Sequence, residues 1–207
     1  MKKIYLPFFL IFAFTTYAQE EDTTTNGFNI TGSVDVYARF NLNSFNRNYE
    51  NIDAPAPATS FANKPGFAIG MANVIMSYEK GKVGAVADLV FGPRGEDAVF
   101  NSTGSSNIVN QLYVYWNVSD KISLTLGNWN TYLGYEVISP TANFNYSTSY
   151  MFSYGPFSHT GLKADFALSD EFSAMVSVMN PTDYTEFNPA GTYTLGAQLG
   201  YTKDAGS

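Results

Sequence analysis

Alternation of apolar and polar residues is the feature that most limits how this chain can fold. In His159–Leu168, the residues of one parity are mostly apolar, and those of the other parity include Lys163 and Asp165. Phe172–Asn180 repeats the pattern after the short polar segment Ser169–Glu171. Because successive side chains of a β-strand point to opposite faces, both runs predict strands with one apolar and one polar face. The segment between them suits a tight hairpin turn.

The same alternation recurs along the chain and predicts an antiparallel, all-β fold. The predicted strands are Phe28–Asn41, Phe67–Tyr78, Lys82–Gly92, Asn107–Val118, Lys121–Asn130, His159–Leu168, Phe172–Asn180 and Tyr193–Thr202. In the second strand, the even-numbered residues from Ala68 to Tyr78 are assigned to the apolar face, although Phe67 and Ile69 on the other face are apolar as well. The faces of this strand are therefore the least clearly defined.

The connections between the predicted strands alternate in length. Short connections of two or three residues lie near residues 80, 120 and 170, and long ones of about ten to thirty residues begin near residues 42, 93, 131 and 181. Outer-membrane β-barrels have this asymmetry, with short periplasmic turns and long extracellular loops. Closure of such a sheet also pairs every backbone N–H and C=O group inside lipid. We therefore expect a transmembrane β-barrel.

Aromatic residues at the ends of the apolar faces agree with this interpretation. Tyr78 and Trp116 lie near the turn ends of their strands, and Tyr193 and Tyr201 bracket the apolar face of the last strand. Tyr and Trp are enriched where a membrane meets water. A secreted β-sandwich also has alternating strands and remains the alternative. Its strands are usually shorter, however, and its connections do not alternate so regularly in length.

The first residues resemble a targeting signal. Lys2 and Lys3 precede the apolar run Ile4–Phe14, and a small residue, Ala18, lies at a suitable cleavage site. We expect residues 1–18 to be a cleaved secretory signal peptide, which disfavours the alternative of a buried N-terminal helix. The following acidic segment, residues 19–27, is predicted to be a flexible leader, and residues 28–207 to form the barrel.

Composition narrows the class of protein. The formal net charge is −7, and loss of Lys2 and Lys3 with the signal makes it −9. Few cations and an acidic balance argue against a nucleic-acid partner. The chain has no Cys, so disulfides and thiolate chemistry are excluded. Aromatic residues form 16% of the chain and charged residues 14%, whereas soluble domains have about 25% charged residues. These proportions suit a barrel in an outer membrane.

Several segments resemble the β-barrel porin-2 (OmpL-like) family of bacterial outer-membrane porins. They are Phe91–Glu96 (FGPRGE), Asn110–Val114 (NQLYV), Leu133–Glu136 (LGYE), Asn143–Tyr150 (NFNYSTSY) and Gly155–Asp165 (GPFSHTGLKAD). The likeness extends from about Ile30 to Asn180 and is strongest within Leu133–Asp165. The resemblance implies a diffusion porin of the outer membrane of a diderm bacterium.

The same resemblance bears on the length of the barrel. Members of that family are longer and have more strands. This sequence ends at Ser207, just after a predicted strand and without a terminal aromatic strand. We expect the chain to be an N-terminal part of a larger barrel.

The polar parity of the strands predicts the lining of the lumen. The predicted pore-lining residues are Asp35, Tyr37, Arg39, Asp88, Arg94, Tyr113, Tyr115, Lys163 and Asp165, with Arg94 in a loop above the strands. An Arg or Lys that faces lipid at mid-depth costs about 2–4 kcal/mol, so inward placement is required whatever the function. A sharper interpretation is a transverse field of opposed charges that orients polar solutes. The sequence alone leaves both open.

No residue pattern points to chemistry. His159 is the one His in the chain, and no G-x-S-x-G motif surrounds a Ser. His159 is therefore expected to be a polar lining residue. Calcium-loop patterns are also absent. We expect no enzyme activity, no cofactor and no metal site.

The long connection Thr131–Ser158 is unusually rich in aromatic residues. Its candidate constriction residues are Phe144, Tyr146, Tyr150, Phe152 and Tyr154. So much ring area is costly to leave in water, and we expect the segment to pack against protein. Folding into the lumen would narrow the pore; a cap above the barrel or an extension of the flanking strands is the alternative.

These observations predict an outer-membrane porin for passive diffusion of small polar solutes. The alternative is a small structural or adhesion barrel whose lumen is plugged by side chains. The expected partners are outer-membrane lipids and small polar solutes, with no nucleic acid. The sequence leaves the identity of the solute and the oligomeric state open, and a homo-oligomer is compatible with it.

Overall fold

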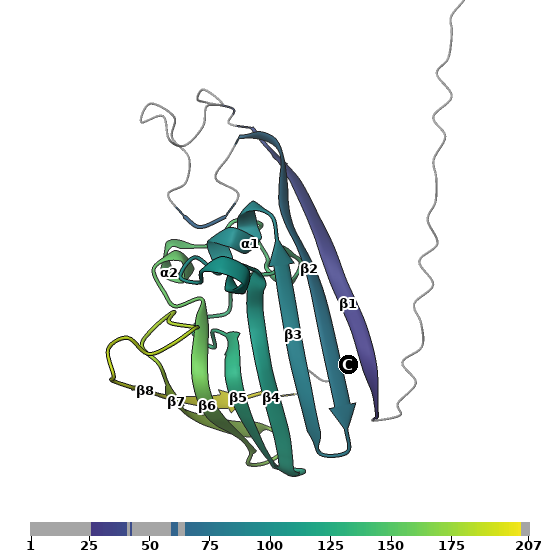
Figure 1. The fold of residues 1–207 in the computed structure, drawn as a ribbon, viewed down its shortest axis with the longest axis vertical. Helices are drawn as coiled ribbons and strands as arrows, with labels where there is room; N and C mark the ends of the chain where they lie inside the picture. The colour runs from purple at the N-terminus through teal and green to yellow at the C-terminus, as the bar shows by residue number, and fades with distance from the viewer. Residues whose placement is uncertain (1–25, 41, 43–58, 62–64, 204–207) are drawn as a thin grey trace, which may run out of the picture.

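The computed structural model describes residues 26–40, 42, 59–61 and 65–203 as one antiparallel sheet with short helices at one end (Figure 1). The strands are β1 (Asn26–Arg39), β2 (Gly66–Lys80), β3 (Val83–Phe91), β4 (Val109–Ser119), β5 (Ile122–Asn130), β6 (Ser158–Ala167), β7 (Phe172–Met179) and β8 (Thr194–Tyr201). All the predicted strands are present. The predicted signal peptide lies outside the described residues, and β1 begins at Asn26, so it includes the last two residues of the predicted leader.

The strands pair in sequence order, from β1 to β8, each antiparallel to the next. This is the wall of a β-barrel, and it curves from β1 round to β8 (Figure 1). Within the described residues, the edge strands β1 and β8 are not paired with each other. The turns after β2, β4 and β6 lie at the end of the sheet opposite to the long loops.

The two faces of the sheet differ sharply in exposure. On β8, the outward-facing Leu195 and Leu199 are 81% and 84% exposed, whereas Met175 and Met179 on the inner face of β7 are 5% and 1% exposed. Further exposed apolar residues on the outer face are Val34, Val36, Phe67, Ile69, Leu112, Val114, Leu126 and Val176. Apolar surface costs about 25 cal/mol per Å² when it is left in water. A continuous apolar face of this kind suits the hydrocarbon of a membrane.

A β-bulge in β2 corrects the predicted faces of that strand. Val34 pairs with Ala72, but Val36 pairs with Ile69, so β2 has one extra residue at this point. The extra residue reverses the alternation. Phe67 and Ile69 consequently face outward, at 87% and 66% exposed. The assignment of Ala68 and Gly70 to the outer face was wrong; that of Ala72 through Tyr78 holds.

The long loops fold onto the inner side of the sheet and form the apolar core. They contain α1 (Pro93–Ala98), η1 (Gly104–Ile108), η2 (Pro140–Ala142) and α2 (Tyr150–Ser153). The buried cluster consists of Phe61, Met71, Val90, Ala98, Val99, Ile138, Phe152 and Phe157. It joins three long loops to β2 and β3 at the loop end of the sheet. No helix in the described part of the chain is long and apolar enough to cross a membrane.

Candidate functional site

The inner face and the aromatic loop meet at Tyr146. Its ring centroid lies 5.0 Å from that of Tyr37 on β1. Its hydroxyl group donates a hydrogen bond to the carboxylate of Asp35. Asp35 precedes Tyr37 by two residues and therefore lies on the same face of β1. Gly70 on β2 makes room for this contact, because a Cβ atom there would collide with the Asp35 carboxylate and the Tyr146 hydroxyl. The bulge that turns Gly70 inward therefore shapes this part of the lumen wall.

Arg94, at the start of α1, holds the loops together. Its side chain is 3% exposed; Nε donates to the carbonyl of Ile138 at 2.8 Å, and Nη1 donates to the carbonyl of Tyr146 at 3.0 Å. The guanidinium also lies 4.2 Å from the ring centroid of Phe61. Burial lowers the pKa of Arg94 from its ordinary value, and the nearby Tyr146 and Asp35 oppose this shift. The structure thus places this predicted pore-lining cation inside the packing of the loops.

Asp88 on β3 is enclosed by amide groups. It is 3% exposed and accepts hydrogen bonds from Asn110 Nδ2 at 2.7 Å, Asn73 Nδ2 at 3.3 Å and Gln111 Nε2 at 3.3 Å. Asn73 in turn accepts from the backbone and side chain of Ser33. These donors compensate for burial of the carboxylate.

A second irregularity makes this amide arrangement possible. Asp88 pairs with Gln111, but Leu89 pairs with Val109, so Asn110 is an extra residue in β4. A bulge lets two successive side chains approach the same partner. Alternation alone puts Asn110 on the opposite face from Gln111, which is why the sequence did not identify it as a lining residue.

Tyr115 and Glu79 form a third contact on the inner face. Glu79, Gly84 and Tyr115 lie opposite one another on β2, β3 and β4. The Tyr115 hydroxyl donates to Glu79 Oε2 at 3.0 Å. The ring lies across Gly84, where a Cβ atom would fall 2.3 Å from it. Tyr113, two residues earlier on the same face of β4, is half-buried. Both predicted tyrosines thus lie on the inner wall.

Lys163 and Asp165 on β6 form an ion pair, with 3.0 Å between Nζ and Oδ2. Their side chains are 24% and 41% exposed, and the Lys163 ammonium lies 5.8 Å from the ring centroid of Trp129. The two charges neutralise each other on one wall. Arg39 also lies on the inner face, at the loop end of β1.

His159 lies on the inner wall, next to Thr131 and Tyr132. Its Nε2 is 3.0 Å from Thr131 Oγ1, and its ring lies 4.9 Å from that of Tyr132. A hydrolytic triad requires a nucleophile and a carboxylate in line with the imidazole. Within the part of the chain that the structure describes, His159 contacts Thr131 and the rings of Trp129 and Tyr132.

A profile of the family described as "Putative beta-barrel porin-2, OmpL-like" matches residues 27–207. The chain belongs to this porin family. No curated protein and no solved structure matches it. Membership supports a porin-like role in the outer membrane and suggests a non-enzymatic protein.

The aromatic loop of this porin is only partly packed. Tyr146 lies against β1, and Phe152 is 5% exposed in the buried cluster. Phe144, Tyr150 and Tyr154 are instead 94%, 56% and 83% exposed. The candidate constriction residues therefore fall into two groups, of which one is anchored to the wall and one reaches into open space.

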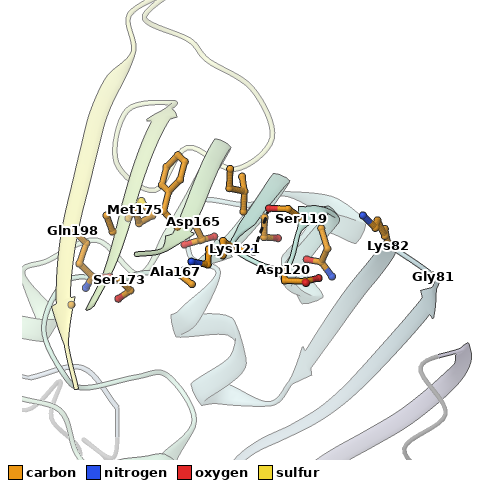
Figure 2. A pocket seen from close by; sticks show the side chains of 16 residues that line it. Gly81, Lys82, Ser119, Asp120, Lys121, Asp165, Ala167, Ser173, Met175 and Gln198 are labelled. Carbon is orange, nitrogen blue, oxygen red and sulfur yellow. Dashed lines mark hydrogen bonds between the residues drawn. The ribbon is translucent and has the colours of Figure 1, made fainter. Parts of the chain in front are cut away.

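The turn end of the porin wall is hollow. A cavity of about 600 Å³ lies on the inner face there, between the short turns and β8 (Figure 2). Its polar lining residues are Lys82, Asn117, Ser119, Asp120, Lys121, Ser123, Asp165, Ser173 and Gln198. Cations and acids are both present, and the space is large enough for a small polar solute with its water.

Proposed function

We propose that this porin forms a passive, water-filled channel for small polar solutes. The observation that carries the proposal is the difference between the two faces: the inner face holds hydroxyl, amide and charged groups around an open cavity, while the outer face is apolar and exposed. A solute that moves along such a wall exchanges water for protein hydrogen bonds and needs no energy source. Membership of the porin family supports this role.

The charges of the wall favour weak discrimination between anions and cations. Asp88 is buried among three amide donors, and Lys163 and Asp165 form an ion pair. Arg94 is buried among the loops. Charges that are paired, or buried away from the open lumen, contribute less to the field at its centre than exposed single charges. We therefore infer that size, rather than net charge, selects the solutes.

The narrowest part of the channel is proposed to lie at the loop end, where Tyr146 contacts the wall. The hydroxyl group of Tyr146 donates to Asp35, and Arg94 holds the Tyr146 backbone. These contacts anchor the aromatic loop over the inner face. The exposed rings of Phe144 and Tyr154 extend from this anchored segment into the space beside it.

Conductance in planar bilayers tests the proposal. The purified chain should form channels, and deletion of Asn143–Tyr154 should raise the conductance because it removes the anchored segment. Tyr146→Phe keeps the ring but loses the donor to Asp35, so it should increase current fluctuations. Phe144→Ser, at a side chain 94% exposed, serves as the matched control and should leave the anchoring intact.

Heat-modifiable migration in gels establishes that each variant has assembled. An assembled chain without conductance would contradict the channel and favour a plugged structural barrel. An assembled deletion variant whose conductance equals that of the unaltered chain would show that the loop does not narrow the pore.

A further inference from the structure

The outer face of the sheet has a groove near the short turns. Its volume is about 450 Å³. The outward-facing side chains that line it are Tyr78, Val83, Ala85, Val114, Trp116, Leu124, Leu126 and Leu162. The groove thus crosses β2 to β6 at the end of the sheet where β2 joins β3 and β4 joins β5.

The register explains why the surface is hollowed here. Tyr78, Ala85, Val114, Leu126 and Leu162 occupy one row of paired positions across five neighbouring strands. Ala85 is the small member of this row, so the surface is low between the larger side chains on either side. Cross-strand neighbours on one face stand close enough together to form continuous walls.

The next row towards the turns brings a cation to the rim of the groove. Lys80 pairs with Val83, and Val83 pairs with Trp116. Paired residues share a face, so Lys80 lies on the outer face with the groove residues Val83 and Trp116. Lys80 is exposed, and no acid pairs with its ammonium group among the described residues.

Two further cations, Lys82 and Lys121, lie in the turns that join β2 to β3 and β4 to β5. The Lys82 ammonium donates to the carbonyl of Val118, at 3.4 Å, next to the turn that holds Lys121. Asp120 is the acid of that second turn, whereas Glu79 points inward to Tyr115. The turn between β6 and β7 has the opposite character, with Asp170 and Glu171.

We propose that this groove binds an anionic phospholipid, with an acyl chain along Ala85 and the phosphate group at Lys80. The proposal rests on the proposed outer-membrane barrel. The apolar groove suits the acyl chain of a phospholipid, and the Lys and Trp at its interfacial end suit the charged headgroup. Short turns face the periplasm in such barrels, which places the groove in the phospholipid leaflet. A second copy of the chain would have to supply an acid for Lys80, and the described outer-face residues around the groove are apolar.

Quenching of tryptophan fluorescence by brominated lipids tests the site. The chain has two Trp residues: Trp116 is 50% exposed in the groove, and Trp129 is 5% exposed on the inner face. In a Trp129→Phe background, Trp116 reports which lipid occupies the groove. The barrel is reconstituted in phosphatidylcholine that contains increasing fractions of dibrominated phosphatidylglycerol, or of dibrominated phosphatidylcholine as the neutral probe.

The anionic lipid should bind beside Trp116 about fivefold more strongly than the neutral one, as expected for one cation near an anionic lipid. Lys80→Ala should remove this preference. Lys203→Ala is the matched control, because Lys203 lies at the same end of the sheet but beyond β8, and it should retain the preference. Equal quenching by the two lipids in the unaltered chain, or a preference that survives Lys80→Ala, would overturn the proposal.

A second probe separates failure of this site from failure of the barrel. Leu199→Trp, in a background of Trp116→Phe and Trp129→Phe, places a reporter on the outer face of β8, at a residue 84% exposed. Quenching of this reporter but not of Trp116 would mean that protein, such as a second copy, covers the groove. Absence of quenching at both positions would overturn the membrane-embedded barrel itself.

Discussion

At the loop end of the inner face, Phe61 and Arg94 are 1% and 3% exposed, whereas the turn end holds a cavity of about 600 Å³. The loop end is built from contacts between segments far apart in sequence, such as that of Arg94 with Tyr146. The turn end is lined by the short turns and the ends of the strands beside them. Passage of solutes through the lumen should therefore be controlled at the loop end, where the loops pack. The turn end should act as an entrance whose residues tolerate substitution.

The largest effect is expected from removal of the buried cation at the loop end. Arg94→Ala leaves the carbonyl groups of Ile138 and Tyr146 without their donors, which we expect to destabilise the loop packing by about 3 kcal/mol. Cleavage of the loops by chymotrypsin in the membrane-inserted barrel should become about a hundredfold faster if it occurs from the open state. Folding of the strands should be unaffected.

Lys121→Ala is the corresponding change at the turn end. Lys121 is exposed and lines the cavity. Its loss should change the stability of the loop packing by no more than about 0.5 kcal/mol and should leave the rate of loop cleavage nearly unchanged. Comparable acceleration of cleavage by both substitutions would contradict the difference between the two ends.

A smaller effect sharpens the comparison within the loop end. Asp183, which follows β7, accepts hydrogen bonds from the backbone N–H groups of Phe157 and Ser158, at 2.7 and 3.1 Å. Burial nevertheless raises the pKa of Asp183 above its ordinary value of 3.8. The packed state therefore binds a proton more tightly than the open state. The packed state of the loop, relative to the open state, should become more stable as the pH falls through the raised pKa, because burial of a charged carboxylate is then avoided; the gain should level off below the ordinary value.

Glu186 in the same loop should respond with the opposite sign. Thr103 donates its backbone N–H to Glu186 at 2.9 Å, which lowers the pKa of Glu186 below its ordinary value of 4.5. The stability from this contact is present above the ordinary value and is lost as the pH falls through the lowered pKa. Rates of loop cleavage by an acid-tolerant protease, measured for Asp183→Asn and Glu186→Gln, separate the two. A pH dependence unchanged by Asp183→Asn would contradict the assignment to Asp183.

The two ends also differ in how well the sequence predicts them. Alternation specifies which residues of a regular strand share a face, and it placed Asp35, Tyr113 and Lys163 on the inner wall. It fails where a strand has one residue more than its partner. The bulges at Gly70 in β2 and Asn110 in β4 depend on the pairing with β1 and β3, and no local pattern encodes them.

Predictions for the loops have a different limitation. The density of rings in Thr131–Ser158 correctly indicated packing for Phe152. It could not distinguish Phe152 from Phe144. A ring of this segment is buried only if it meets side chains of other loops, as Phe152 meets Phe61, which in turn lies against Arg94. The sequence likewise placed Arg94 near the lumen without indicating that carbonyl groups more than forty residues away would enclose it.

The most direct test of the account is whether a solute can pass from the loop end into the cavity at the turn end. The chain has no Cys, so Asp165→Cys introduces a single thiol into the lining of that cavity. A bulky, charged thiosulfonate reagent, added on the loop side of a planar bilayer, should lower the conductance of this variant. Val176→Cys, on the outer face of neighbouring β7 and 50% exposed, should give no response. Modification of Asp165→Cys only from the turn side, with the conductance unchanged, would contradict a continuous channel.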